Sequence, residues 1–290
     1  MNIGNPRHKE FDHPESLQQF RGKTLAVIGC GKLGGALVRS LVRTLFTEPD
    51  RVLACDVSQA ALEPLSRECG VQTTADSGSA VSNADFVILA TKPQGIEAAL
   101  REMLPALQQK KSKPILISVA AGVSLGKIRE VLADNARLVR AMPNVGCLIG
   151  CGMTGVFSES AEVGQMACAL FKSVGFAIPL AKEEDLDAVT GLSASGPAFV
   201  ITFIEALAEG GVKMGLSREE ALLLASHTVA GAAALVLESG RSPAQLRELV
   251  ATPGGTTLAG LEVLDRGALR QTVIAAVEAS TLRAGELLVK

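Results

Sequence analysis

The sequence predicts an α/β fold, a doubly wound parallel sheet, followed by a domain built of helices alone. Up to about residue 181, apolar β-branched runs alternate with stretches of helical period. Nearly continuous apolar strands separated by helices are typical of a parallel sheet that is covered on both faces. Beyond residue 182 only helical patterns follow, and a glycine-rich turn joins the first strand to the first helix.

Six strands are expected where apolar residues run together, with 175–180 closing the layer. They are 24–29, 51–57, 85–91, 114–122, 137–144 and 175–180. Helical period lies between most of them, as in 33–45 and 58–69. The sheet therefore belongs to residues 23–181, after a polar extension over 1–22 that we expect to contribute little to the fold.

The helical domain, 182–290, begins with a stretch over 187–215 that is apolar on nearly all sides, as in a buried helix. Gly215 is expected to end it. Capping boxes at Ser217–Glu220 and Ser242–Gln245 open the next helices. Helices this apolar cannot face water in a monomer, so we expect burial against a second copy of the chain.

The composition excludes several classes of partner. The net charge is −2 and no basic stripe exists to neutralise phosphates, so we expect no nucleic acid. The longest apolar run, 221–237, contains Ser226, His227 and Thr228 and is too short for a membrane span. No signal peptide is recognisable at the start, and the six scattered cysteines are expected to be reduced and mostly buried. We therefore expect a cytoplasmic protein without a metal site.

The turn "IGCGKLGGAL" carries the pattern Gly29-x-Gly31-x-x-Gly34 between a strand and a helix. Gly29 allows a tight turn, Gly31 lets the backbone reach a pyrophosphate, and Gly34 lets helix and strand approach. The helix amides that follow, including those of Lys32 and Leu33, can hold the anion. The first domain is thus expected to be of the Rossmann type and to bind a dinucleotide, the alternative being a simple strand–helix turn.

Asp56 ends the second strand at about the spacing expected for an acid that binds the ribose of the dinucleotide. A carboxylate there accepts hydrogen bonds from a 2′-hydroxyl and repels a 2′-phosphate, so we expect NADH to be preferred over NADPH. The alternative is a helix cap shared with Ser58.

The other strand ends point to the same crevice, because the carboxyl ends of parallel strands meet at one edge. Cofactor contacts are expected there from Ala90, Lys92, Pro93, Ala120, Gly122 and Asn144. Lys92 is equally compatible with a solvated lysine that has no function.

A nicotinamide domain indicates hydride transfer, but the chain lacks a His or Lys placed to handle the proton of an alcohol. A cyclic imine needs no such acid, because its nitrogen is basic enough to arrive protonated. The enzyme then needs only to bind and orient the imine. "TPGGTT" (252–257) provides suitable groups, namely backbone amides converging at a helix start and hydroxyls beside them. A glycine-rich helix entry capped by threonine is the alternative interpretation.

Several motifs resemble pyrroline-5-carboxylate reductases, in the order of that family. They are the glycine-rich loop, "TKP", "SVAAGVSL", "AVTGLSASGPAFV", "ALAEGGVKMGL" and "ELVATPGGTTLAGLEVLDRGALR". The resemblance covers the chain from about residue 23 to its end.

The resemblance implies NAD(P)H-dependent reduction of 1-pyrroline-5-carboxylate to L-proline, the last step of proline biosynthesis. It implies that Thr257 binds the ring nitrogen, and that Thr252, Gly254, Gly255 and Thr256 hold the carboxylate. It also implies a homodimer, which often assembles into rings. The alternatives are a reductase of another cyclic imino acid, a catalytically silent NAD(P)-sensing protein, and a hydroxyacid dehydrogenase.

The sequence departs from the family pattern at three positions. Ala194 and Phe199 stand where Gly and Tyr are common, which affects only local packing. Asp56 replaces the small hydroxyl or basic residues that many members place near a 2′-phosphate, so the frequent NADPH preference of the family is in doubt here.

Overall fold

A computed structural model describes residues 20–44 and 47–288 of the chain. Within them the chain divides into two compact units, which are described separately. The sheet unit comprises residues 20–195 and 279–288, and the helical unit comprises residues 196–278. The predicted boundary at 182 stays a prediction, and residues 1–19 of the predicted extension lie outside the described residues.

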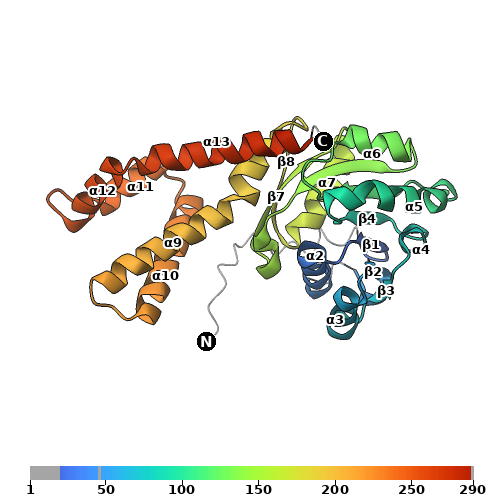
Figure 1. Cartoon of the computed structure of the whole chain (residues 1–290), viewed down its shortest axis with the longest axis horizontal. Helices are drawn as coiled ribbons and strands as arrows, with labels where there is room; N and C mark the ends of the chain where they lie inside the picture. The colour runs from blue at the N-terminus through green and yellow to red at the C-terminus, as the bar shows by residue number, and fades with distance from the viewer. Residues whose placement is uncertain (1–19, 45–46, 289–290) are drawn as a thin grey trace. The chain divides into compact units, whose positions relative to one another are not determined.

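The sheet unit contains eight strands in the order β3-β2-β1-β4-β5-β6-β7-β8 (Figure 1). The strands are β1 (Leu25–Ile28), β2 (Val52–Cys55), β3 (Gln72–Thr74), β4 (Phe86–Leu89), β5 (Ile115–Ser118), β6 (Arg137–Met142), β7 (Gly152–Phe157) and β8 (Gly175–Pro179). The helices and short turns are α2 (Lys32–Arg43), η2 (Pro49–Arg51), α3 (Gln59–Cys69), α4 (Ser77–Val81), η3 (Pro93–Gly95), α5 (Ile96–Gln108), α6 (Leu125–Leu132), η4 (Val145–Ile149), α7 (Ala161–Lys172), α8 (Asp185–Val189) and η5 (Thr190–Ala194).

The sheet is parallel from β3 to β6, as predicted, but not throughout. β7 pairs antiparallel with β6, and β8 then pairs parallel with β7 at the edge of the sheet. Only the short η4 turn lies between β6 and β7, whereas a parallel return needs a crossover of about a dozen residues. The expectation of a purely parallel sheet was therefore wrong for its last two strands, while the prediction that 175–180 closes the layer is confirmed.

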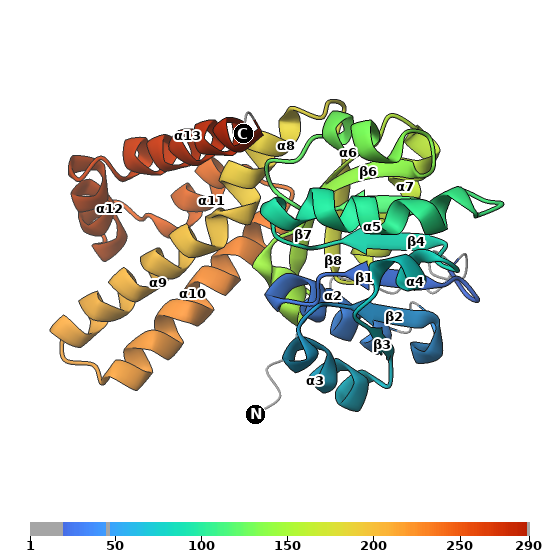
Figure 2. The same cartoon turned by 45° about the vertical axis from the view of Figure 1, so that its right-hand side comes forward.

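Helices cover both faces of the sheet, and each face has its own core. Along β1, Leu25 and Val27 pack into the core beneath α2, α3 and α7. The alternate residues Ala26 and Ile28 pack into the core beneath α4, α5 and α6, with α5 lying across that face (Figure 2). Successive side chains of a strand point to opposite faces, so strands apolar at every position are the expected consequence.

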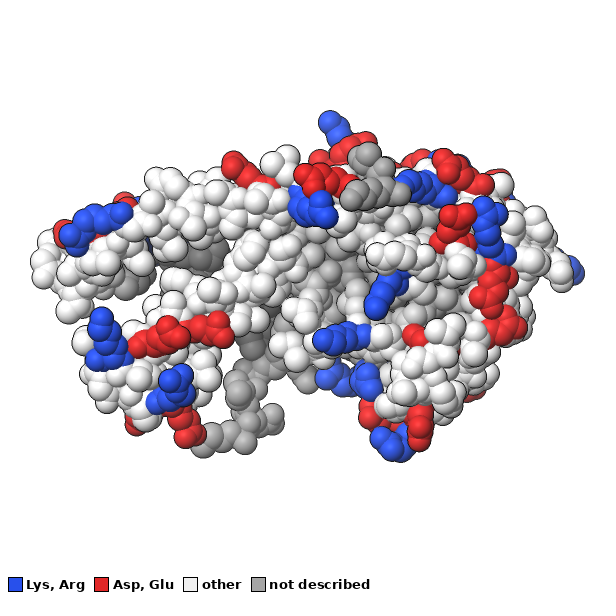
Figure 3. Space-filling model, in the orientation of Figure 1, with Lys and Arg blue, Asp and Glu red and all other residues white. Residues whose placement is uncertain are grey.

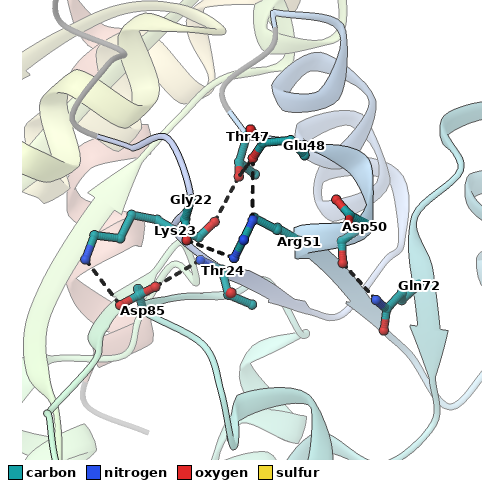
Figure 4. A network of polar contacts seen from close by, with 9 residues as sticks. All are labelled: Gly22, Lys23, Thr24, Thr47, Glu48, Asp50, Arg51, Gln72 and Asp85. Carbon is teal, nitrogen blue, oxygen red and sulfur yellow. Dashed lines mark hydrogen bonds and ion pairs between the residues drawn. The ribbon is translucent and has the colours of Figure 1, made fainter.

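A network of polar contacts holds the amino ends of β1 to β4 together (Figure 4). The carboxylate of Asp85, before β4, accepts the amide of Thr24 at 3.0 Å and lies 3.5 Å from the ammonium of Lys23. Arg51 donates to the carbonyl of Gly22 at 3.0 Å, and Gln72 of β3 donates to that of Asp50 at 2.8 Å. This edge is thus fixed by the protein's own groups, and the chemistry is expected at the opposite edge.

One part of the predicted extension belongs to the core. Phe20 is fully buried, and its ring lies 5.3 Å from that of Phe86 in an edge-to-face arrangement. The expectation that residues up to 22 contribute little to the fold is therefore wrong at Phe20, because a buried aromatic pair stabilises the start of the sheet.

The cysteines behave as predicted. All six are free, four are buried, Cys69 is half-buried and Cys151 is exposed. No group of His, Cys, Asp or Glu suited to a metal ion occurs in the part of the chain that the structure describes.

The helical unit contains α9 (Gly196–Lys213), α10 (Arg218–Glu238), α11 (Pro243–Val250), α12 (Thr256–Arg266) and the first part of α13 (Leu269–Leu288). α9 and α10 pack side by side as a helical hairpin (Figure 1). Both predicted capping boxes are present, at the starts of α10 and α11. Gly215, with a φ of 102°, follows the end of α9 as expected.

Apolar side chains of the helical unit lie on its surface instead of in a core. Only Ala208 is buried in α9, and only Ala221 and Ala225 are buried in α10. The exposed apolar residues include Val200, Ile201, Leu222, Leu223, Val273 and Ile274. Figure 3 shows wide uncharged stretches between the charged groups on the surface of this unit.

Two helical stretches, Asp185–Lys213 and Arg218–Glu238, have the length and hydropathy of a membrane span. The expectation that the run 221–237 is too short for a span was therefore wrong, because the helix extends beyond the run at both ends. Such a pair is weak support for a membrane, because contact helices of oligomers have the same composition. The prediction that α9 is buried fails within a single chain and requires a second one.

Candidate functional site

The glycine-rich turn lies between β1 and α2, as predicted, and two of its glycines are required by packing. Gly29 has a φ of 92°, and a Cβ there would lie 2.6 Å from the amide nitrogen of Thr91. A Cβ at Gly34 would collide with the carbonyl oxygen of Gly29. These positions therefore exclude any larger residue for reasons internal to the fold.

Gly31 is different, because a Cβ there would meet nothing within 4 Å. It is the N-cap of α2 and offers no side-chain cap, and no acidic residue lies in the first turn. The exposed Lys32 and the half-buried Leu33 then begin the helix. Open space and uncapped amides at a helix start form a cradle for an anion such as a pyrophosphate.

Asp56 follows β2 and joins it to the glycine-rich turn. Its Oδ2 accepts the amide of Cys30 at 2.7 Å, and its Oδ1 accepts that of Ser58 at 2.8 Å. Ser58 is the N-cap of α3 and Asp56 accepts its amide, so Asp56 also supports the start of this helix, as the helix-cap alternative expects. Each carboxylate oxygen keeps further acceptor capacity for a ribose hydroxyl.

The segment after β4 lies against the glycine-rich turn. Ala90 donates to the carbonyl of Ile28 at 2.7 Å, and the exposed Lys92 and Pro93 follow. The hydroxyl oxygen of Thr91 is buried and has no hydrogen-bond partner among the described residues. A buried hydroxyl without a partner costs free energy, so Thr91 is a candidate contact that the sequence analysis missed. The sequence pattern that could have indicated Thr91 is a hydroxyl residue between Ala90 and Lys92.

The ends of β5 and β6 complete this edge of the sheet. Ala120 is buried after β5, and Gly122 has a φ of 74°. A Cβ at Gly122 would lie 2.8 Å from that of Leu287 in α13, so its small size accommodates the end of the chain. Asn144 follows β6 and makes hydrogen bonds within the protein through both atoms of its amide group. Cofactor contacts of these residues stay predictions.

Adjacent strands bring the predicted cofactor residues to one edge. β2, β1, β4, β5 and β6 are neighbours in the sheet, and each ends in one of the segments described above. An anion cradle, a carboxylate and a buried hydroxyl without a partner fit a dinucleotide that lies across these ends.

The helical unit has a candidate binding turn of its own, between α11 and α12. Gly254 has a φ of 70°, and the amide of Gly255 donates to the carbonyl of Thr252 at 3.0 Å. A Cβ at Gly255 would lie 2.5 Å from the hydroxyl oxygen of Thr252. A side chain at Gly255 would therefore require the hydroxyl group of Thr252 to move.

Gly255 is the N-cap of α12, so no threonine caps this helix. The alternative interpretation, a helix entry capped by threonine, is therefore not what the structure contains. Thr256 and Thr257 occupy the first two helical positions, the former exposed and the latter half-buried. The first turn contains no acidic residue, so its amides and the positive end of the helix dipole can receive a carboxylate.

The fold and the two turns define a nicotinamide-dependent oxidoreductase of the Rossmann type with a helical C-terminal domain. Comparison with known proteins agrees for both regions. Residues 183–287 match a family profile described as pyrroline-5-carboxylate reductase dimerisation, and residues 24–122 match one described as NADP oxidoreductase, coenzyme F420-dependent.

Relatives of known name cover nearly the whole chain. A pyrroline-5-carboxylate reductase of Methanosarcina acetivorans is 35% identical over 92% of this chain and 99% of its own. A solved pyrroline-5-carboxylate reductase of Coxiella burnetii is 35% identical, with a TM-score of 0.85 over 91% of this chain and 98% of its own. The Plasmodium falciparum pyrroline carboxylate reductase, solved with NADP bound, is 28% identical, with a TM-score of 0.82 over 92% and 98%.

The chain belongs to the pyrroline-5-carboxylate reductase family. It is an NAD(P)-dependent oxidoreductase, and its match to the dimerisation profile identifies it as a homo-oligomer. The exposed apolar residues of α9 and α10 lie within the matched residues, which accounts for their exposure in a single chain.

Proposed function

We propose that this protein reduces 1-pyrroline-5-carboxylate to L-proline with NAD(P)H, the last step of proline biosynthesis. The turn over residues 252–257 carries this proposal. It combines an uncapped helix start with hydroxyl groups, in a chain of the pyrroline-5-carboxylate reductase family.

The substrate carboxylate is assigned to the start of α12. The backbone amides at Gly254 and Thr256 provide the donors, and the exposed hydroxyl of Thr252 lies beside them. Gly255 contributes by closing the turn, because its own amide donates to the carbonyl of Thr252. The positive end of the helix dipole adds a favourable interaction with a negative group of about 0.3–1 kcal/mol at an exposed site. Binding and orientation of the acid thus need no basic side chain.

Thr257 is assigned to the ring nitrogen. A protonated imine carries an N–H that the hydroxyl oxygen of Thr257 can accept, which orients the C=N bond. Bound NAD(P)H supplies the hydride to the imine carbon, and the resulting amine takes its second proton from water. Because the substrate arrives already protonated, Thr257 has to orient the ring and not to deliver a proton.

The proposal includes a preference for NADH. Asp56 presents a carboxylate at the end of β2, where a 2′-phosphate would meet a like charge. The exposed side chain that follows it, Val57, is apolar and offers a phosphate no partner.

The proposal also includes a homodimer as the basic unit, able to form a ring of dimers, and a cytoplasmic location without nucleic-acid or membrane partners. Six free thiols favour a reducing compartment. The mixed charges of the surface offer no basic stripe in the view of Figure 3.

A substrate panel tests the proposal. NADH oxidation is followed with 1-pyrroline-5-carboxylate, its six-membered analogue and a 2-keto acid, and kcat/KM should be highest for the first. A higher value for either of the others would contradict the assignment. NADH binding without turnover of any substrate would instead support a silent cofactor-sensing protein.

A further inference from the structure

The carboxamide of Asn144 connects three segments of the sheet unit. Its Oδ1 accepts the amide of Gly146 at 3.0 Å and that of Met153 at 3.1 Å. Its Nδ2 donates to the carbonyl of Ser193 at 3.1 Å. Three of the four hydrogen bonds that an asparagine side chain can make are thus formed within the protein.

Ser193 lies in an unusual segment. Residues Thr190–Ala194 form a π-helical turn between α8 and α9, in which the amide of Ser195 donates to the carbonyl of Thr190 at 2.9 Å. π-Helical turns are rare and are found frequently at functional sites.

Pro197 explains why the carbonyl of Ser193 needs an outside donor. A regular helix would pair this carbonyl with the amide four residues later, and that residue is Pro197, which has no N–H. The Nδ2 group of Asn144 takes the place of the missing donor. The turn is therefore completed by a side chain from the end of β6.

A second residue of β6 holds the same segment at its start. Arg140 is 3% exposed, and its guanidinium lies 2.8 Å from Glu183, which precedes α8. The same oxygen of Glu183 accepts the amide of Leu125 at 2.8 Å, at the start of α6. The stretch from Glu183 to Ser193 is thus attached at one end to β6 and at the other to Asn144, just after β6.

We propose that Asn144 is a positioning residue: it fixes the π-helical turn at which the chain passes from the sheet unit into α9. The boundary between the two compact units falls directly after this turn, between Ser195 and Gly196. Hydride transfer tolerates little displacement of the groups that hold the reactants, and a loose turn would let the start of α9 move. The inference rests on the proposed function for its kinetic consequence, but not for its structural one.

The test compares Asn144→Leu with a matched control, Asn135→Leu. Asn135 also donates from Nδ2 to a carbonyl, that of Leu132 at 2.8 Å, in the turn after α6. Asn144→Leu removes all three hydrogen bonds of the side chain, one of which goes to residues 190–198, and should speed amide hydrogen exchange there about tenfold. It should also lower kcat for the imino acid about tenfold and leave the Kd for NADH within about twofold. The control Asn135→Leu should change neither the exchange in residues 190–198, nor kcat, nor the Kd for NADH.

Pro197→Ala tests whether the missing amide of Pro197 is the reason that the carbonyl of Ser193 needs Asn144 as a donor. Alanine restores an N–H that can reach the carbonyl of Ser193, so Asn144→Leu should have a smaller effect in the Pro197→Ala background than alone. If Asn144→Leu does not fold, Asn144→Asp replaces it. Aspartate keeps the acceptor for Gly146 and Met153, and it replaces the donor to Ser193 with a charged oxygen that repels the carbonyl.

Two results would overturn the inference. One is a raised Kd for NADH with unchanged exchange in residues 190–198, which would make Asn144 a cofactor contact instead. The other is a full effect of Asn144→Leu in the Pro197→Ala background. If the wild-type protein reduces no imino acid, the proposed function fails, and the exchange measurement still decides the role of Asn144.

Discussion

The sheet unit and the helical unit bury their apolar residues in different ways. Both faces of the sheet are covered by helices of the same chain, and its central strands β1, β4 and β5 are fully buried. Among the described residues of the helical unit, the buried cluster consists of Ala208, Ala221 and Ala225, and large apolar side chains remain on the surface. The first unit is complete within one chain, whereas the second is completed by another copy.

The two turns proposed to bind ligands, one in each unit, can be compared in the same way. Each places a glycine at the N-cap of a helix whose first turn contains no acidic residue. Gly29 and Gly34 are constrained by the backbone around them, but Gly31 and Gly254 have open space where a Cβ would be. Both turns therefore leave room for a ligand beside uncapped amides.

The largest expected effect follows from breaking the helical unit's contact with a second copy. Leu223 is 58% exposed in one chain, so Leu223→Glu should leave the folded monomer intact. A charge buried at a contact costs about 3 kcal/mol or more, which would weaken association by roughly a hundredfold. Sedimentation should show monomers, and activity should fall with them.

The matched control for that variant is Ile178→Glu, an exposed apolar residue of β8 in the sheet unit. It should leave the oligomer unchanged. An unchanged oligomer for Leu223→Glu would mean that the apolar surface around Leu223 is not the contact.

The glycines of the first turn separate packing from ligand binding. Gly34→Ala should destabilise the sheet unit by about 1–3 kcal/mol, because its Cβ collides with the carbonyl of Gly29. Gly31→Ala should leave the thermal midpoint nearly unchanged and raise the Kd for NADH about tenfold, because the added methyl group lies where the pyrophosphate approaches. Calorimetry and NADH titration measure the two effects. Equal losses of stability in both variants would show that Gly31, like Gly34, is required for packing.

Asp56→Asn tests the cofactor preference. Neutralising the carboxylate should shift the ratio of kcat/KM for NADH to that for NADPH by about tenfold towards NADPH, which corresponds to about 1.4 kcal/mol. The measurement is a pair of steady-state titrations at one ionic strength. A wild-type enzyme that already prefers NADPH would contradict the role given to Asp56.

Thiol reactivity reports on the sheet unit alone, because all six cysteines lie within it. Burial, together with the nearby Asp56 carboxylate, raises the pKa of Cys30 to about 12. Burial likewise raises the pKa of Cys147 and of Cys168 to about 11. At pH 8 the thiolate fraction of such groups is lower by about two orders of magnitude or more than that of an ordinary thiol.

Alkylation at pH 8, mapped by mass spectrometry, should therefore modify the exposed Cys151 first. The rates at the buried thiols should rise with pH, since deprotonation is what limits them. The same pattern should persist in Leu223→Glu, which acts only on the helical unit. Rapid modification of Cys30 in the native protein would show that the sheet unit opens more readily than its core suggests.

Much of the sheet could be predicted, because buried parallel strands appear in a sequence as apolar runs and the glycine spacing reflects backbone geometry. β3 was missed because it is a short edge strand of polar residues, Gln72–Thr74. β7 was missed because its glycines weaken the strand signal, and with it the antiparallel pairing to β6.

The parts of the site that could not be predicted depend on contacts between distant residues. The turn over residues 252–257 was identified from its composition. The composition alone could not exclude a helix capped by threonine, and the observed N-cap at Gly255 does so. The helical period runs smoothly through residues 190–194 and gives no sign of the π-helical turn. Asn144 was singled out by its place at a strand end, while its bond to Ser193 spans 49 residues of sequence.

The central claim is that Thr257 orients the imine nitrogen, and Thr257→Ala tests it most directly. Thr272→Ala is the matched control, because Thr272 also lies in the first turns of a helix and its hydroxyl donates only to the carbonyl of Ala268. The account predicts that Thr257→Ala lowers kcat/KM for 1-pyrroline-5-carboxylate about tenfold or more, as a hydrogen bond to a charged group contributes about 1.5–3 kcal/mol. The Kd for NADH should stay within about twofold of the wild type, since Thr257 is assigned to the substrate alone. An unchanged kcat/KM for Thr257→Ala would contradict the account.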